Sequence, residues 1–475
     1  MPESWVNSAE RIGSDLHLAL AGTGSRRAAL GQALREAIQD GRLAAGVRLP
    51  PYRSLAVDLG IARNTVADAY AELVAEGWLT ARQGSGTRVA ERAAPVKRPR
   101  VPKKAPTAGS GVPLHNLLQG TPDASSFPRN AWSASTRRAL THAPHDAFGP
   151  GDPQGRIELR TALTDYLARV RGVRTTPERI VICAGFSDAL RLLFGGGVLR
   201  GSLAVEAYGL AFHRALLATG GVRTVPLGLD DHGTRTEELA GHRGVRSVLL
   251  TPAHQFPIGG PLSPARRNVA VDWARARGGA VIEDDYDGEF RYDREPVGAV
   301  QALDPDHVLY LGSTSKSISP ALRLGWMVLP ERLVDPVLAT KGQRERWTSV
   351  VDQLTFADLI TSGAYDRHIR QMRQRYRDRR NRLVAALTEH TPHIEVTGIA
   401  AGLHAVLRLP PGTEASTLKA AAWRGLALDG LADYRHPAAT TPPLDGLVVG
   451  YATPPDHAYA AAIEALCQIL PPTTT

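Results

Sequence analysis

The stretch VIEDDYDGEFRYDREPVGAVQALDPDHVLYLGSTSKSISPALRLGWM, from Val281 to Met327, decides how the large part of this chain is interpreted. It begins with a short apolar segment that predicts a buried strand and ends in Glu283-Asp284-Asp285-Tyr286. A second apolar segment, Val308 to Leu311, runs into Gly312-Ser313-Thr314-Ser315-Lys316. Because parallel strands present their functional residues at their carboxyl ends, we expect both groups of side chains at one edge of a sheet.

An acid, a phenol, hydroxyls, a lysine and an arginine together suit pyridoxal 5'-phosphate. The aldehyde of this cofactor forms a Schiff base with a lysine amine, and its pyridinium nitrogen takes an acidic partner. A charge-assisted bond to that nitrogen is roughly twice as strong as a neutral one, and arginine binds phosphate oxygens through two donors. The predicted contacts are Lys316 with the aldehyde, Asp284 with the ring nitrogen, Tyr286 with the ring oxygen, and Ser313, Ser315 and Arg323 with the phosphate.

The segments EDDYDGEFRY and SKSISPALRLGW resemble the cofactor region of pyridoxal-phosphate enzymes of the aspartate-aminotransferase type, known as fold type I. They are most similar to the MocR branch of GntR-like transcription regulators. This resemblance implies a multidomain chain, in which an N-terminal winged helix-turn-helix precedes an aminotransferase-like α/β domain with a small C-terminal α/β subdomain. We expect the winged helix at residues 1–90, a flexible basic linker at 91–113 and the aminotransferase-like domain at 114–475, with its small subdomain from about residue 385.

The first ninety residues carry a helix-turn-helix pattern. Residues 25–39 have leucine and isoleucine at helical spacing, and two short helices are expected at 53–59 and 63–76, separated by Gly60-Ile61-Ala62. A hairpin is expected at 78–89. The segment LPPYRSLAVDLGIARNTVADAYAELVAEGWLTARQGSGTRVA resembles the GntR winged-helix domain, apart from Pro51-Tyr52, where the family usually has small or polar residues.

The start of the second helix of this motif indicates DNA binding. In helix-turn-helix proteins this helix lies in the major groove with its first residues at base edges, where Arg suits guanine and Asn suits adenine. We therefore expect Arg63, Asn64 and Thr65 to read bases. Phosphate and wing contacts are expected from Arg53, Ser54, Arg82, Gly84, Ser85, Gly86 and Thr87. The alternative is that Arg63-Asn64-Thr65 is only a solvated helix start, because helix-turn-helix look-alikes occur in helical cores.

The totals fit a chain of more than one domain with a polyanionic partner. The chain has 475 residues, a formal net charge of +9 and a pI of about 9.7. Residues 91–113 are rich in Pro, Lys and Arg and predict an extended tether that adds weak DNA contact. Cys183 and Cys467 stand in separate apolar runs, and we see no signal peptide or membrane span. These features predict a cytoplasmic protein, and no metal site is expected.

Strands that alternate with helices between residues 179 and 329 predict a mostly parallel sheet. A strand at 179–184 leads into Gly185-Phe186-Ser187, and the unpaired N–H groups of that helix start suit the cofactor phosphate. In the family an aromatic residue after the next strand stacks on the pyridine ring. Tyr208 is the candidate in this chain.

Two departures from the enzyme pattern bear on activity. Fold type I enzymes place an asparagine on the ring oxygen where this chain has Phe256, in the MocR marker HQFPxG, so that contact is lost or supplied by His254 or Gln255. Aminotransferases also clamp the substrate carboxylate with an arginine near the final strands. The segment LDGLVVGYA carries none, and Arg435 is the nearest candidate. Loss of this anchor argues against ordinary transamination.

The leading interpretation is a pyridoxal-phosphate-dependent DNA-binding transcription regulator. The resemblance implies a homodimer, and its symmetry implies an operator of double-stranded DNA with paired half-sites. The regulator would sense vitamin B6 status through the cofactor, or an amino compound as a small-molecule effector. The alternatives are a working aminotransferase with an incidental DNA-binding head, and a cofactor-free dimerisation scaffold on a DNA-binding protein.

Overall fold

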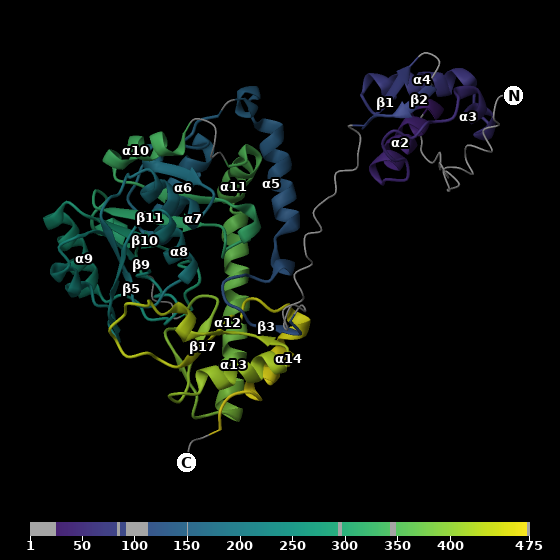
Figure 1. The fold of residues 1–475 in the computed structure, drawn as a ribbon. Coiled ribbons are helices and arrows are strands. Elements are labelled where there is room, and N and C mark those ends of the chain that lie inside the picture. Colours follow the sequence, from purple (N-terminus) through teal and green to yellow (C-terminus); the bar gives the residue numbers. More distant parts are fainter. Residues whose placement is uncertain are drawn as a thin grey trace. The chain divides into compact units, whose positions relative to one another are not determined.

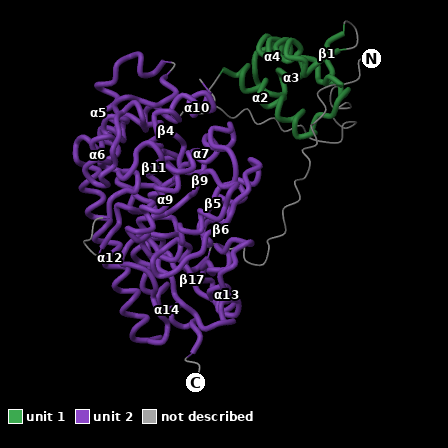
Figure 2. Tube along the Cα trace, turned by 90° about the vertical axis from the view of Figure 1, so that its left-hand side faces the viewer, with its two compact units in different colours: residues 1–110 green, residues 111–475 purple. Residues whose placement is uncertain are grey.

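The computed structural model describes residues 25–82, 86–91, 113–149, 151–292, 297–342 and 348–472. The chain divides into two compact units, residues 1–110 (unit 1) and 111–475 (unit 2), which Figure 2 draws in different colours. None of the helices in the described ranges combines the length and the hydropathy that a bilayer crossing needs.

The described part of unit 1 consists of helices closed by a hairpin. Its elements are α2 (Arg26–Gln39), α3 (Tyr52–Asp58), α4 (Arg63–Ala75), β1 (Leu79–Arg82) and β2 (Gly86–Val89). Leu30 and Leu34 of α2 share one face because they are four residues apart, and they pack with Val66 and Leu73 of α4 in one apolar core. β1 and β2 pair antiparallel. The expected helix-turn-helix and hairpin are therefore present, with bounds within a residue or two of those predicted.

Unit 2 is organised around a seven-stranded sheet. Its order is β4 (Ile180–Cys183), β12 (Gly325–Val328), β11 (Val308–Ser313), β10 (Ala280–Asp284), β9 (Val245–Leu250), β5 (Ser202–Glu206) and β6 (Thr224–Leu227). β12 runs antiparallel to both of its neighbours, and the other pairs are parallel. The prediction of a mostly parallel sheet is confirmed.

Helices cover both faces of this sheet (Figure 1). Alternate residues of one strand serve the two faces, so that Ile180 and Ile182 pack into one core cluster while Val181 and Cys183 pack into another. The first cluster includes residues of α6 (Ile157–Arg171), α11 (Val350–Thr361) and α12 (Ala364–His390). The second includes residues of α7 (Phe186–Leu190), α8 (Ala211–Thr219) and α10 (Glu331–Lys341). Further elements are α5 (Arg129–His142), α9 (Pro264–Arg277), β7 (Leu229–Asp230) and β8 (Gly233–Thr234).

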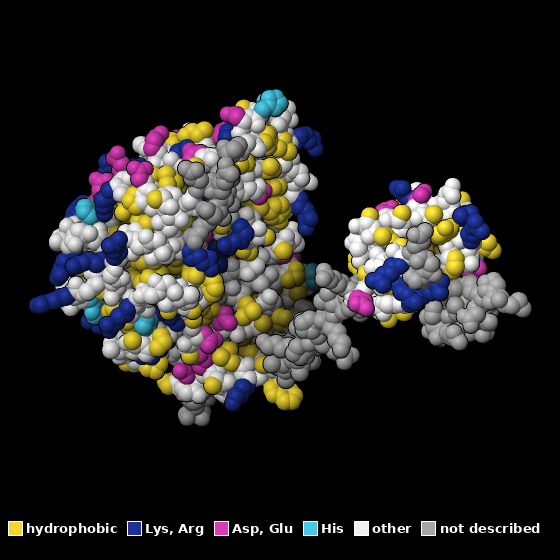
Figure 3. All heavy atoms as spheres, turned by 45° about the horizontal axis from the view of Figure 1, so that its top comes forward, with side chains coloured by type: hydrophobic (Ala, Val, Ile, Leu, Met, Phe, Trp, Pro, Cys, Tyr) yellow, Lys and Arg dark blue, Asp and Glu magenta, His cyan; other side chains and the backbone are white. Residues whose placement is uncertain are grey.

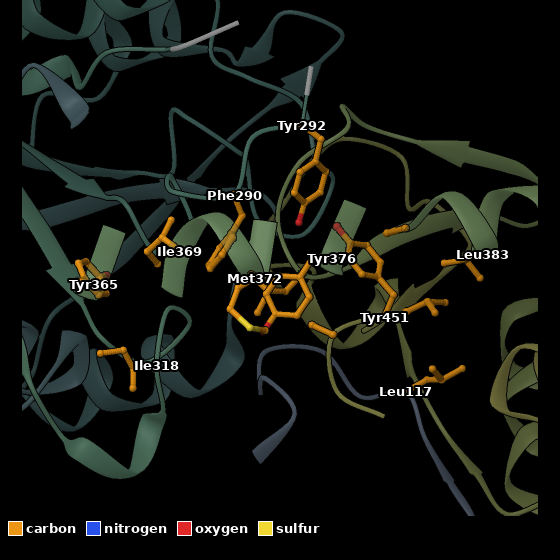
Figure 4. Close-up of a cluster of buried hydrophobic side chains, with 14 of the residues drawn as sticks. Leu117, Phe290, Tyr292, Ile318, Tyr365, Ile369, Met372, Tyr376, Leu383 and Tyr451 are labelled. Atoms are coloured by element: carbon orange, nitrogen blue, oxygen red, sulfur yellow. The ribbon is translucent and has the colours of Figure 1, made fainter. Parts of the chain in front are cut away.

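The long helix α12 carries the chain from the large sheet to a C-terminal subdomain. Tyr365, Ile369, Met372 and Tyr376 recur every three or four residues and lie along one buried face of α12, where the ring of Tyr376 is 5.2 Å from that of Phe290 (Figure 4). α12 follows α11 after only Ser362 and Gly363, and Gly363 has a φ of +69°.

The C-terminal subdomain contains a four-stranded antiparallel sheet. Its order is β13 (Glu395–Thr397), β14 (Ala405–Arg408), β17 (Gly446–Val449) and β16 (Asp429–Gly430), and α13 (Glu414–Trp423) and α14 (Asp456–Cys467) accompany it. The beginning of unit 2 belongs to this region, because β3 (His115–Asn116) pairs in parallel with β15 (Leu426–Ala427). The expected boundary near residue 385 lies inside α12.

Candidate functional site

A cavity lies at the carboxyl ends of the central parallel strands. Asp284 is the last residue of β10 and Ser313 is the last of β11, and these two strands are parallel neighbours with Asp284 opposite Leu311. The predicted site residues that line the cavity are Asp284, Tyr286, Ser313, Ser315, Lys316, Arg323, Phe186, Ser187 and Tyr208. This location agrees with the rule that open α/β sheets bind ligands at the carboxyl ends of their strands.

The four residues Glu283 to Tyr286 divide between the cavity and the protein interior. Asp284 and Tyr286 line the cavity. Asp285 instead accepts two hydrogen bonds from Arg171, at 2.6 and 3.0 Å, and one from the Tyr310 hydroxyl at 2.6 Å. Glu283 accepts from two backbone N–H groups, and burial raises its pKa to about 7. Two of the consecutive acids thus hold the fold together, a role that the sequence reasoning missed.

Asp284 and Lys316 are a half-buried acid and a half-buried amine that line the same cavity. Burial, followed by the charges of Asp285 and Asp287, raises the pKa of Asp284 well above its usual range. A cationic ring nitrogen beside Asp284 would restore the ionised carboxylate. Burial lowers the pKa of Lys316, although Asp287 and Asp284 oppose this shift. A lowered pKa increases the fraction of free amine, which is the nucleophilic form of a lysine.

The Lys316 ammonium donates a hydrogen bond to the backbone carbonyl of Gly120. Gly120 has a φ of +92°, and a Cβ at this position would lie 2.8 Å from the Lys316 nitrogen. The segment after β3 therefore approaches the lysine by its backbone. Sequence reasoning did not include Gly120, and no local pattern around residue 120 signals this contact.

The cavity lining also includes hydroxyl groups and a guanidinium. Gly185 has a φ of +98° and precedes α7, and a Cβ on Gly325 would lie 2.7 Å from the Gly185 Cα. These two glycines therefore allow the start of α7 to reach the end of the sheet. Arg323 has a φ of +50°, a left-handed conformation that non-glycine residues rarely adopt and that is found more often at functional sites. Ser313, Ser315, Ser187 and Arg323 all line this cavity.

Tyr208 lines the cavity but is also fixed at its far end. Its hydroxyl accepts a hydrogen bond of 3.0 Å from the backbone N–H of Leu444, and the ring packs in a small core cluster with Phe256 and Tyr434. His213, which the sequence reasoning did not single out, also lines the cavity, with its ring 4.7 Å from that of Phe186. Burial, followed by the nearby charges of Lys316 and Arg214, lowers the pKa of His213 to about 4. The cavity therefore has an uncharged imidazole on its wall.

Two arginines near the cavity are bound to backbone carbonyls. Arg435 donates to the carbonyl oxygens of Ala439 and Thr441, both at 2.7 Å, and it does not line the cavity. Arg214 does line the cavity, but it donates to the carbonyls of Gly209, Tyr434 and Arg435. The guanidinium groups of both therefore serve loop structure.

The residues of this cavity fit pyridoxal phosphate in their chemistry. A lysine whose pKa is lowered, a carboxyl that a cation would ionise and a phenol lie with a cluster of hydroxyls and an arginine. These are the groups that the aldehyde, the ring nitrogen, the ring oxygen and the phosphate require.

The candidate nucleic-acid interface of unit 1 is the start of α4 with the hairpin. Arg63 and Asn64 are exposed and Thr65 is half-buried, and the Arg63 guanidinium lies 5.2 Å from the centre of the Tyr52 ring. The departure at Tyr52 thus gives Arg63 a cation–π partner. Figure 3 shows Lys and Arg side chains grouped on the visible face of this unit.

The predicted phosphate contacts lie on α3 and the hairpin. Arg53 is exposed and Ser54 half-buried on α3, while Arg82 ends β1 and Gly86 and Thr87 begin β2. Gly84 and Ser85 lie outside the described residues. The DNA contacts of all these residues stay predictions.

Two family models match the chain. The model of bacterial regulatory proteins of the gntR family matches residues 26–89. The model of aminotransferases of class I and II matches residues 116–429. The chain therefore combines a GntR helix-turn-helix domain with an aminotransferase-type domain.

Relatives with both parts cover most of the chain. The HTH-type pyridoxine biosynthesis transcriptional regulator PdxR of Corynebacterium glutamicum is 32% identical over 411 residues, which are 85% of this chain and 88% of the relative. The probable rhizopine catabolism regulatory protein MocR of Rhizobium meliloti is 30% identical over 440 residues, 88% of each chain. The HTH-type transcriptional regulator TauR of Rhodobacter capsulatus is 29% identical over 432 residues, 84% of this chain and 87% of TauR.

Solved structures give the fold of unit 2. An archaeal alanine:glyoxylate aminotransferase aligns with a TM-score of 0.68 at 22% identity, over 76% of this chain and 91% of the enzyme. The kynurenine aminotransferase of Pyrococcus horikoshii aligns equally well at 23% identity, with the same coverage. At these identities the solved structures show the fold alone, which is that of fold type I. The family matches and the regulator relatives show that the chain belongs to the MocR-type branch of the GntR family of transcription regulators.

Proposed function

We propose that unit 2 holds pyridoxal 5'-phosphate on Lys316, and that this site makes the DNA binding of unit 1 responsive to the cofactor or to an amino compound. The observation that carries the proposal is the convergence of Lys316, Asp284 and Tyr286 with Ser313, Ser315 and Arg323 in one cavity. When bound, the cofactor supplies an electrophilic carbon to which primary amines add. The fold type I architecture and the regulator relatives support the proposal.

The residues of the cavity have separate tasks in this proposal. Lys316 attaches the cofactor, Asp284 holds the proton on its ring nitrogen, and Tyr286 faces its ring oxygen. The serines, Arg323 and the helix start at Phe186 and Ser187 hold the phosphate. Gly185 precedes this helix start and does not itself line the cavity. Tyr208 or His213 covers the ring face, since both rings stand on the cavity wall.

The hydrogen bonds of Arg214 and Arg435 favour a sensing role for the site over the turnover of amino acids. Neither Arg214 nor Arg435 offers a guanidinium that is free of backbone carbonyls, so neither of these two arginines is held ready as a carboxylate clamp. We propose vitamin B6 status as the first signal to test, because one relative is named as a regulator of pyridoxine biosynthesis.

The proposed assembly is a homodimer, located in the cytoplasm, on an operator with paired half-sites. A twofold dimer presents its recognition helices with the same symmetry as a palindromic operator. Sedimentation of the full chain tests the dimer. An operator selected from random duplex DNA by the full chain tests the paired half-sites.

The first experiment is visible absorbance of the purified full chain, before and after addition of pyridoxal phosphate and then borohydride. We expect a yellow band that reduction fixes to the protein, and a change in affinity for the selected operator when the cofactor is present. A colourless chain that takes up no cofactor would instead support a dimerisation scaffold. Amino donors that are turned over at enzyme-like rates would support a working aminotransferase.

The change Arg63→Ala is expected to weaken binding to the selected operator by about 1–3 kcal/mol, because a bidentate base contact is lost. The variant should lose base specificity at only one position of the operator. In competition assays, operators that differ only at this position should then bind the variant with similar affinity. Affinity for the operator that is unchanged would contradict the assignment.

Arg53→Ala is the comparison, because Arg53 is expected at a phosphate. It should weaken all duplexes similarly and reduce the salt dependence of binding, with the slope of log K against log [salt] decreasing by about one. A sequence-specific loss for Arg53→Ala and a uniform loss for Arg63→Ala would exchange the two roles.

A further inference from the structure

His254 stands behind the cavity wall, between Tyr286 and Asp287. Its Nδ1 lies 2.7 Å from Oδ2 of Asp287 and 3.0 Å from the hydroxyl oxygen of Tyr286. The side chains of His254 and Asp287 are only 3% and 2% exposed. Tyr286 is the member of this trio that lines the cavity. The trio thus forms a buried path from a carboxylate to a phenol at the cavity surface.

Both contacts of His254 use the same nitrogen, so one proton decides their direction. A nitrogen that carries a proton can donate but has no lone pair with which to accept. The shorter contact is to a carboxylate, and charge-assisted hydrogen bonds are shorter and stronger than neutral ones. The geometry therefore assigns the Nδ1 proton to His254, donated toward Asp287. The Tyr286 hydroxyl then cannot donate to this nitrogen.

The Tyr286 proton then has two possible acceptors: Asp287, whose hydrogen bond with the phenol contributes to its raised pKa, and a ligand in the cavity. Burial, followed by the charges of Asp287 and Asp284, raises the pKa of Tyr286 well above its usual range, so the phenol keeps its proton. Asp287 is the competing acceptor for this proton. The N–H of His254 occupies Oδ2 of Asp287 and so weakens that competition.

The side chains of His254 and Asp287 fit beside Gly402 and Gly259 because these two residues have no Cβ. A Cβ on Gly402 would lie 2.4 Å from Oδ2 of Asp287 and 2.5 Å from Cε1 of His254. A Cβ on Gly259 would lie 3.4 Å from Nε2 of His254. This pair of side chains is therefore fitted between two backbone segments and has little room to turn.

The apolar residue beside the trio makes Tyr286 more important. Phe256 lines the cavity with its ring 5.7 Å from that of Tyr286, in an edge-to-face contact. A phenyl ring offers no hydrogen bond to a ligand oxygen. His254 and Gln255, its neighbours in the sequence, do not line the cavity, and Gln255 donates to Glu206 and to the carbonyls of Tyr208 and Phe256.

We propose that His254 and Asp287 are positioning residues that orient the Tyr286 hydroxyl as a hydrogen-bond donor toward the ring oxygen of pyridoxal phosphate. The inference rests on the proposed function. In this inference Tyr286, oriented by His254 and Asp287 in an Asp–His–Tyr relay, makes the ring-oxygen contact that Phe256 cannot make. His254 acts only through Tyr286 and does not itself contact the cofactor.

A comparison of two ligands tests the relay. Dissociation constants of the full chain are measured by absorbance titration for pyridoxal 5'-phosphate and for 3-deoxypyridoxal 5'-phosphate, which lacks only the ring hydroxyl. The wild-type chain should prefer the complete cofactor by about tenfold, the effect of one hydrogen bond to a charged oxygen. Tyr286→Phe is the benchmark and should bind both compounds about equally.

His254→Phe and Asp287→Asn should reduce the preference toward that of Tyr286→Phe, mainly by weakening the complete cofactor. Adding His254→Phe to Tyr286→Phe should then cause no further loss of preference. A merely structural role would weaken both compounds alike and leave the preference at its wild-type value, which would overturn the relay. Because the readout is a ratio, partial destabilisation of a variant does not imitate the expected result.

Two further outcomes separate this inference from the proposed function. A wild-type chain that binds both compounds equally would refute the ring-oxygen contact while cofactor binding stands. A wild-type chain that binds neither compound would refute the proposed function and the relay together.

Discussion

The change Lys316→Ala is expected to abolish borohydride-stable attachment of pyridoxal phosphate to the protein. Lys316 supplies the only lysine amine among the described residues that line the cavity, and its lowered pKa increases the free amine that adds to the aldehyde. The yellow band of the covalent form should be absent from the variant. Reduction followed by peptide mass analysis should find no label on residues 313–319.

Lys419→Ala is the matched control, because Lys419 lies on α13 and away from the cavity. This variant should retain the band, the label and the affinity of the wild-type chain. Lys341 is a buried lysine that donates to the carbonyls of Pro153 and Ile182 at 2.5 and 2.6 Å, and it does not line the cavity. A label that persists in Lys316→Ala would remove Lys316 from its assigned role.

The change Asp285→Ala is expected to destabilise unit 2 by about 3–5 kcal/mol, the usual cost of leaving one partner of a buried ion pair alone. The Arg171 and Asp285 side chains are only 4% and 2% exposed, and Tyr310 donates to the same carboxylate. Its removal leaves a buried guanidinium without its counter-charge. Urea unfolding followed by tryptophan fluorescence measures the change as a lower midpoint.

Asp230→Ala provides the control for burial. Asp230 also accepts two hydrogen bonds from one arginine, Arg266, but its side chain is 42% exposed. Solvent-exposed pairs contribute about 0–1 kcal/mol, so this variant should unfold close to the wild-type midpoint. Equal midpoints for Asp285→Ala and the wild-type chain would show that the buried pair does not stabilise the unit.

Asp284→Asn separates the two neighbouring acids by function. Asp284 faces the cavity and has no arginine partner among the hydrogen bonds of the described residues, so its replacement should leave the unfolding midpoint nearly unchanged. The same change removes the acid expected at the ring nitrogen and should weaken cofactor binding about tenfold or more. The change at position 284 would then weaken cofactor binding, whereas the change at the adjacent position 285 would lower the stability of unit 2.

Much of the sheet and of the cavity follows from local sequence. The strands predicted at 179–184 and from Val308 are present as β4 and β11, because short apolar runs between turns are strong signals. The side-chain period of two places Asp284 and Tyr286 on one face of the chain. Asp284, Tyr286, Ser313 and Lys316 could therefore be placed together from two strand ends.

Contacts between distant segments could not be predicted in this way. Arg171 meets Asp285 across 114 residues, and the Tyr208 hydroxyl meets Leu444 across 236. Neither contact leaves a signal in composition or periodicity, since packing alone brings the segments together. The same reason explains why His213 and Gly120 were missed.

The pairing of β3 with β15 has a consequence for the order in which the chain can fold during synthesis. Gln119, just after β3, donates a hydrogen bond to Tyr434, 315 residues later. The segment that opens unit 2 therefore cannot reach its final position until most of the chain has left the ribosome. The core of unit 1 needs only residues within 26–89 and can form long before. A nascent chain thus completes its helix-turn-helix head while the unit that would govern it is still being made.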